Sequence, residues 1–136
     1  MAEALFKKML LEQGLGDRIS IESAGTSSQH VGETPHRGVF RMGEEHGLSL
    51  DGKRARQVRS EDFEKFDLLV AMDRSNYETL LASNPAAKAK IHLLLDYAKT
   101  REKNVHDPYF DDDFERTYRQ VEAGCQGLLA HLLRID

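Results

Sequence analysis

Asp67-Leu68-Leu69-Val70-Ala71-Met72 is the stretch that decides the fold. Such a continuous apolar run predicts a strand that is covered on both faces, as in a parallel sheet between helices. Asp73 or Ser75 can cap a helix immediately after it, and Asn84-Pro85 ends that helix. The stretch therefore predicts one strand and one helix of an alternating α/β domain.

Similar elements lie on both sides of this unit. Strands are expected over residues 19–23 and 91–95, and helices over residues 1–13, 37–46 and 112–133. Helix, strand, helix, strand, helix, strand, helix is the order of a three-layer, doubly wound parallel sheet with helices on both faces. The first helix starts at Met1 with no capping residue before it, whereas such a domain normally begins with a strand.

Composition limits the classes of function. The chain has 136 residues, a formal net charge of −4 and one cysteine, Cys125. We expect one domain over residues 1–136, a reducing, cytoplasmic environment, and no membrane or nucleic-acid partner. No histidine spacing indicates a metal site, and we expect no cofactor. Cys125 falls on the apolar stripe of the last helix, which predicts a buried core residue rather than a nucleophile.

Several short motifs occur in an order that resembles a known family. They are Met1-Ala2-Glu3-Ala4-Leu5-Phe6, Ser23-Ala24-Gly25-Thr26, His30-Val31-Gly32, Pro35-His36-Arg37-Gly38, Arg54-Ala55-Arg56-Gln57, Ala71-Met72-Asp73-Arg74-Ser75-Asn76 and Asp107-Pro108-Tyr109-Phe110. Together they resemble the low-molecular-weight protein-tyrosine phosphatases of bacterial type. The resemblance covers essentially the whole chain.

The resemblance implies a four-stranded sheet and a Cys-x5-Arg phosphate loop, which follows the family's first strand. Residues 1–136 contain neither that strand nor that loop, so we expect an N-terminally truncated domain. The missing strand would lie between residues 19–23 and 67–72. Its loss would expose sheet edges, through which the chain could associate with itself. A start-site error, a deliberate choice of expressed region and a natural truncation all remain open.

The resemblance also assigns roles to site residues. It implies that Asp107 is the general acid of phosphomonoester hydrolysis through a cysteinyl-phosphate, and that Tyr109 and Phe110 wall the substrate pocket. The implied substrate is a phosphotyrosine protein or an aryl phosphate. Without the nucleophile and the arginine, we expect this chain to be inactive. A non-catalytic truncated paralogue that acts as a binding module, and a protein-arginine phosphatase if the loop is restored, are the alternatives.

Overall fold

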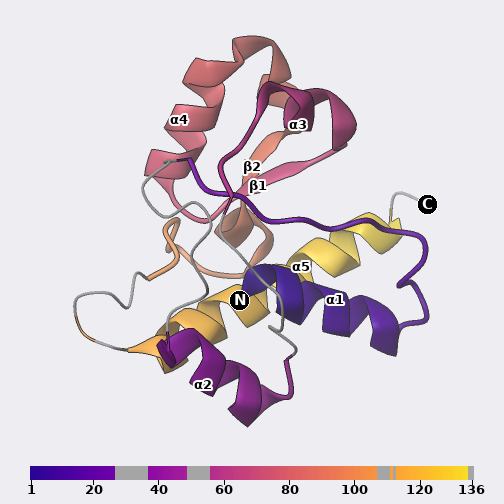
Figure 1. Ribbon diagram of the computed structural model, residues 1–136, viewed down its shortest axis with the longest axis vertical. Coiled ribbons are helices and arrows are strands. Elements are labelled where there is room, and N and C mark those ends of the chain that lie inside the picture. The colour runs from indigo at the N-terminus through magenta and orange to yellow at the C-terminus, as the bar shows by residue number, and fades with distance from the viewer. Residues whose placement is uncertain (27–36, 49–55, 107–110, 112, 135–136) are drawn as a thin grey trace.

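The computed structural model describes residues 1–26, 37–48, 56–106, 111 and 113–134, with no side-chain description for residues 37–40. Figure 1 shows two strands with helices on either side of them. In chain order the elements are α1 (Ala2–Glu12), α2 (Arg37–His46), α3 (Ser60–Lys65), β1 (Leu69–Ala71), α4 (Arg74–Ser83), the 3-10 helix η1 (Pro85–Lys90), β2 (Ile91–Leu93), the 3-10 helix η2 (Leu94–Tyr97) and α5 (Phe114–Arg134).

Strands β1 and β2 pair in parallel, with Leu69 opposite Ile91 and Ala71 opposite Leu93. Successive residues of β1 face opposite sides of the sheet, as the pleat requires. Val70 packs against the core cluster that contains residues of α1 and α5, whereas Leu69 and Ala71 belong to the cluster beneath α3 and α4. Both faces of the small sheet are therefore covered by helices, and the predicted α/β class is confirmed.

The long helix α5 packs closely against η2. Gly124 and Gly127 lie at this contact, where a Cβ atom on Gly127 would stand 1.8 Å from the carbonyl oxygen of Tyr97. Glycine is thus required at residue 127 by the close approach of another backbone. The contact anchors the middle of α5 beneath the loop that follows η2.

Local capping signals predicted several element ends. Asp73 is the N-cap of α4, and its carboxylate accepts a hydrogen bond of 2.7 Å from the backbone N–H of Asn76. Helix α4 ends at Ser83, directly before Asn84-Pro85. Gly14 and Gly47 have φ of 71° and 70°, as expected for glycines that follow a helix. No side chain forms a capping hydrogen bond at Met1, the N-cap of α1.

The strand prediction for residues 19–23 is wrong. Residues 19–23 have no regular secondary structure. The nearby residue Gly25 forms only an isolated parallel bridge to Gln57. A strand exists through hydrogen bonds to a neighbouring strand, and among the described residues β1 pairs with β2 alone. The predicted strand at residues 91–95 is also shorter, because Leu94 and Leu95 begin η2.

Within the described part of the chain, none of the helices has the length and apolar character needed to cross a bilayer.

Candidate functional site

Three segments that are distant in sequence meet at the carboxyl end of β1. The carbonyl of Met72 accepts a hydrogen bond of 2.8 Å from the N–H of Val105. The N–H of Arg74 donates to Asn104 Oδ1 at 2.8 Å, and the Asn76 side chain donates to Thr26 Oγ1 at 3.2 Å. The carboxyl ends of strands are where parallel α/β sheets place ligand sites. We therefore take this edge of the sheet as the candidate site.

Two side chains of α5 form hydrogen bonds with the backbone of His106, the residue directly before the proposed site residue 107. Gln120 Oε1 accepts a hydrogen bond of 2.5 Å from the His106 N–H, and the Thr117 hydroxyl donates one of 2.7 Å to the His106 carbonyl. The His106 ring nitrogen Nε2 lies 2.8 Å from Asp111 Oδ1. Backbone and side chain of His106 are thus fixed by three partners.

The carboxylate of Asp111 is stabilised in its charged form. The Asp113 backbone N–H donates to Asp111 Oδ1 at 3.0 Å, and the His106 ring contacts the same oxygen. The hydrogen bond from the Asp113 backbone is the larger cause, and the His106 contact the second, of a pKa for Asp111 that lies below its ordinary value. The segment before α5 therefore carries a fixed negative charge beside His106.

The three residues that the sequence assigns to the site, Asp107, Tyr109 and Phe110, lie outside the described residues. His106, which directly precedes them, is described, and its peptide groups are bonded to Thr117 and Gln120, which sequence reasoning did not single out. These two polar residues are three positions apart and so share one face of α5. Two polar side chains on an otherwise apolar helix face were the signal that could have found them.

Cys125 is buried, as predicted. It is 2% exposed in the core cluster that joins α1 to α5. Burial raises the pKa of its thiol to about 12, so the thiol stays protonated near neutral pH. A nucleophilic cysteine needs a thiolate in an accessible, electropositive setting. Cys125 lacks both properties.

The basic residue Arg56 is occupied by acidic partners. Its guanidinium donates to both carboxylate oxygens of Asp62, at 2.9 and 3.1 Å, and to Glu22 at 3.0 Å. The hydrogen bonds from Arg56 lower the pKa of Asp62 and raise the pKa of Arg56 itself. Arg56 therefore ties the segment after α1 to α3, which is a structural role.

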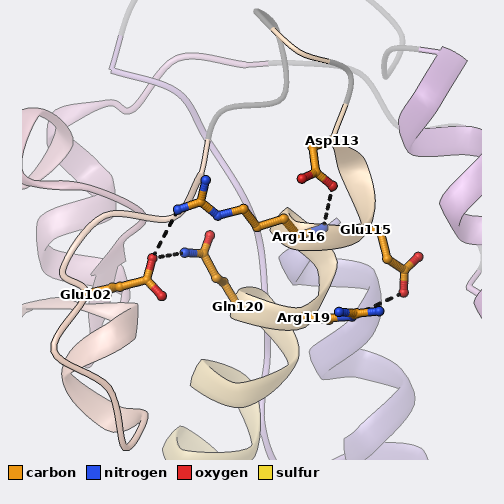
Figure 2. Close-up of a pocket in the computed structure, with 6 residues that line it drawn as sticks. All are labelled: Glu102, Asp113, Glu115, Arg116, Arg119 and Gln120. Carbon is orange, nitrogen blue, oxygen red and sulfur yellow. Dashed lines mark hydrogen bonds and ion pairs between the residues drawn. The ribbon is translucent and has the colours of Figure 1, made fainter.

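A shallow surface pocket lies beside the candidate site, at the start of α5. Figure 2 shows its lining side chains, which are Glu102, Asp113, Glu115, Arg116, Arg119 and Gln120. Charged groups of the lining are paired: Arg116 lies 3.5 Å from Glu102, to which Gln120 also donates at 2.7 Å, and Arg119 lies 3.7 Å from Glu115. None of the lining side chains is a cysteine, serine or threonine, and we interpret the pocket as a support for the segment at His106 rather than as a reaction site.

Comparison with known proteins decides what kind of domain this is. The family model for low molecular weight phosphotyrosine protein phosphatase matches residues 1–135. The chain belongs to this family. Among curated phosphatases, it is 37% identical over 135 residues to YfkJ of Bacillus subtilis, covering 97% of this chain and 86% of that protein. It is 34% identical over 134 residues to PtpA of Staphylococcus saprophyticus, covering 98% and 85% of the two chains.

Solved phosphatase structures have the same fold. The crystal structure of YfkJ from Bacillus subtilis superposes with a TM-score of 0.95 at 34% identity, covering 99% of this chain and 86% of that one. A Drosophila arginine phosphatase superposes with a TM-score of 0.86 at 32% identity, covering 96% of this chain and 87% of that one. The described helices and strands are thus those of a low-molecular-weight phosphatase, with the candidate site at the carboxyl end of β1.

Proposed function

We propose that this phosphatase domain, once a Cys-x5-Arg phosphate loop completes it, hydrolyses phosphate monoesters on protein tyrosine through a cysteinyl-phosphate, with Asp107 as the general acid. The observation that carries the proposal is the match of residues 1–135 to the phosphotyrosine phosphatase family. Phosphoproteins and aryl phosphates are the corresponding substrates, and Tyr109 and Phe110 are the proposed walls of the substrate pocket.

The chemistry runs in two displacements. A cysteine thiolate attacks phosphorus, the bond to the phenolic oxygen breaks, and Asp107 gives its proton to the leaving phenolate. The Asp107 carboxylate then takes a proton from water as the water oxygen attacks phosphorus, which releases phosphate and restores the thiolate. A phosphate loop of backbone N–H groups and an arginine holds the equatorial oxygens in both steps.

The contacts of His106 support this role for its neighbour. A general acid acts only if it is held within hydrogen-bond reach of the leaving atom. Thr117 and Gln120 fix the peptide groups of His106 at 2.7 and 2.5 Å, directly before residue 107. Met72 fixes Val105 to the end of β1 in the same way. The residue preceding the proposed acid is thus held to the sheet and to α5.

Residues 1–136 do not supply the nucleophile in this proposal. The chain has one cysteine, and Cys125 is buried with its pKa raised to about 12. No arginine lies at the position that a Cys-x5-Arg loop built on Cys125 would need. We propose that these residues form a phosphatase domain without the family's first strand and phosphate loop, and that the 136-residue chain alone is inactive.

The test compares two proteins under the same conditions. One is the 136-residue chain, and the other is the same chain extended at its N-terminus by a strand and a Cys-x5-Arg loop. We expect vanadate-sensitive hydrolysis of para-nitrophenyl phosphate by the extended protein and none above background by the shorter one. Vanadate-sensitive turnover by the 136-residue chain would disprove the proposal.

Size-exclusion chromatography with light scattering on the same two samples tests self-association. Among the described residues β1 pairs only with β2, so the other edge of β1 has no strand beside it. An unpaired edge is a template for another chain. We expect the 136-residue chain to form oligomers that the extended protein does not form.

Protein-arginine phosphatase activity is the second candidate. It is favoured by one specific observation, the superposition on a Drosophila arginine phosphatase with a TM-score of 0.86. Turnover of a phosphoarginine peptide by the extended protein, exceeding its turnover of a phosphotyrosine peptide, would select this candidate. Binding of either peptide without turnover would instead select a non-catalytic binding module.

A further inference from the structure

One group of side chains of the kinds that bind metals joins α2 to the first turns of α5. It consists of Glu45, His46 and Glu115, which we call the α2–α5 cluster. One ligand atom from each residue lies within 4.8 Å of the other two. The histidine comes from the end of one helix and Glu115 from the start of another, so only the fold brings them together.

The His46 ring is held in place by its neighbours. It stacks on the Tyr118 ring of α5, with centroids 3.7 Å apart and planes 9° from parallel. The carbonyl of His46 also accepts a hydrogen bond of 2.8 Å from Lys8 Nζ of α1. Three helices therefore determine where the imidazole points, as a metal ligand requires.

The free ring nitrogen of His46 faces a carboxylate without bonding to it. His46 Nε2 is buried and has no hydrogen-bond partner within the described part of the chain. It lies 3.6 Å from Glu115 Oε2, which is too long for a hydrogen bond. Two ligands bound tetrahedrally to one Zn²⁺ at about 2.1 Å stand about 3.4 Å apart. The spacing suits a shared cation better than a shared proton.

The surrounding charges are compatible with a divalent ion. The cluster supplies one neutral imidazole and two carboxylates, a ligand set that zinc and similar ions take in proteins. Arg119 is the nearby cation on α5, and it lies 3.7 Å from Glu115 Oε1, leaving Oε2 on the His46 side. Lys8 is engaged by the His46 carbonyl. Water can complete the coordination on the exposed side of Glu45.

We propose that Glu45, His46 and Glu115 bind one divalent transition-metal ion, with Zn²⁺ as the best fit. The ion links the end of α2 to the start of α5. The site takes no part in phosphate chemistry, and it stands independently of the proposed function.

The test titrates the metal-free 136-residue chain with Co²⁺, which reports coordination through its visible absorption, and then displaces it with Zn²⁺. We expect saturation at one equivalent. His46→Gln and Glu115→Gln should each weaken Zn²⁺ binding by more than tenfold. The matched control is His131→Gln. It removes an exposed histidine from the C-terminal end of α5, the helix that begins near Glu115, and should leave binding unchanged.

Two results would overturn the proposal: no saturable binding, or binding that His46→Gln leaves intact. The second would mean that His46 and Glu115 form only an ion pair. Should the variants fail to fold, nuclear magnetic resonance of the unmodified chain decides the matter. Zn²⁺ must then shift the ring resonances of His46 while leaving those of His131 in place, and unchanged His46 resonances would refute the site.

Discussion

The hydroxyl of Thr117 donates a hydrogen bond of 2.7 Å to the carbonyl oxygen of His106. This bond crosses from the first turns of α5 to the segment that follows η2, which the Val105 N–H also ties to the carbonyl of Met72 at the end of β1. Thr117 is buried, so no bulk water is available to replace the hydroxyl if it is removed. Together with the bond from the His106 N–H to Gln120, this contact therefore helps to place the segment before residue 107.

Thr117→Val should lower the free energy of unfolding by about 1–3 kcal/mol, because the part-buried His106 carbonyl then loses its hydrogen bond from the Thr117 hydroxyl. Urea denaturation of the 136-residue chain measures the loss. Thr79→Val, in an exposed part of α4, is the matched control and should change stability by about 0.5 kcal/mol or less. Equal effects of the two substitutions would show that the Thr117 bond contributes nothing.

Asp107→Asn tests the proposed general acid in the extended protein. Turnover should fall by about 10²- to 10⁴-fold for phenyl phosphate, whose leaving group needs a proton. For para-nitrophenyl phosphate the loss should be small, since para-nitrophenolate leaves without much help. Steady-state kinetics on both substrates give the ratio. Equal losses on the two substrates would argue that Asp107 is structural.

Gly127→Ala should destabilise the protein, although alanine is the better helix former by about 1 kcal/mol. The added Cβ would meet the Tyr97 carbonyl oxygen at 1.8 Å, and a backbone atom of η2 cannot easily move. We expect a loss of about 3 kcal/mol in the free energy of unfolding. Gly124→Ala is the comparison, because its new Cβ would meet the buried side chain of Leu94, with the nearest atom at 2.5 Å, rather than a backbone atom. A gain of stability in Gly127→Ala would contradict the close approach.

Asp62 should make stability depend on pH in the acid range. Hydrogen bonds from Arg56 lower the pKa of Asp62 in the folded protein. Its contribution is therefore fully present above the ordinary aspartate pKa of about 3.9, and is lost as pH falls through the lower, folded value. Asp62→Asn should cost about 2 kcal/mol at pH 7 and progressively less below about pH 4.

Urea denaturation between pH 3 and pH 7 measures how the difference in free energy of unfolding between the unmodified chain and Asp62→Asn shrinks as pH falls. Asp17→Asn is the control, because it makes the same chemical change at an exposed residue. A constant difference between the unmodified chain and Asp62→Asn across this range would remove Asp62 from the acid response.

Local signals allowed much of the fold to be predicted. The residues of β1, the bounds of α2 and the Asp73 cap depend on neighbours within a few positions, and each was predicted from the sequence. Residues 19–23 have the alternation of a strand, yet the pattern cannot say whether a partner strand lies beside them. Among the described residues no strand pairs with residues 19–23, so their alternating pattern alone did not produce a strand.

The contacts that build the candidate site were less accessible to sequence reasoning. Thr117 and His106 are 11 positions apart in the sequence, and Gly127 meets Tyr97 only because η2 packs against α5. Neither pair has a spacing that local rules interpret. Burial of Cys125 was predictable, since it falls on the apolar stripe of a long helix.

The depth of Cys125 makes this thiol a natural reporter of opening in the core between α1 and α5. A thiol reagent reaches a buried sulfur only when the surrounding helices separate, so the labelling rate measures how often they do. With no second cysteine in the 136 residues, the signal comes from a single position. Mass spectrometry of the labelled chain would thus measure how often α1 and α5 separate under native conditions, without any engineered probe.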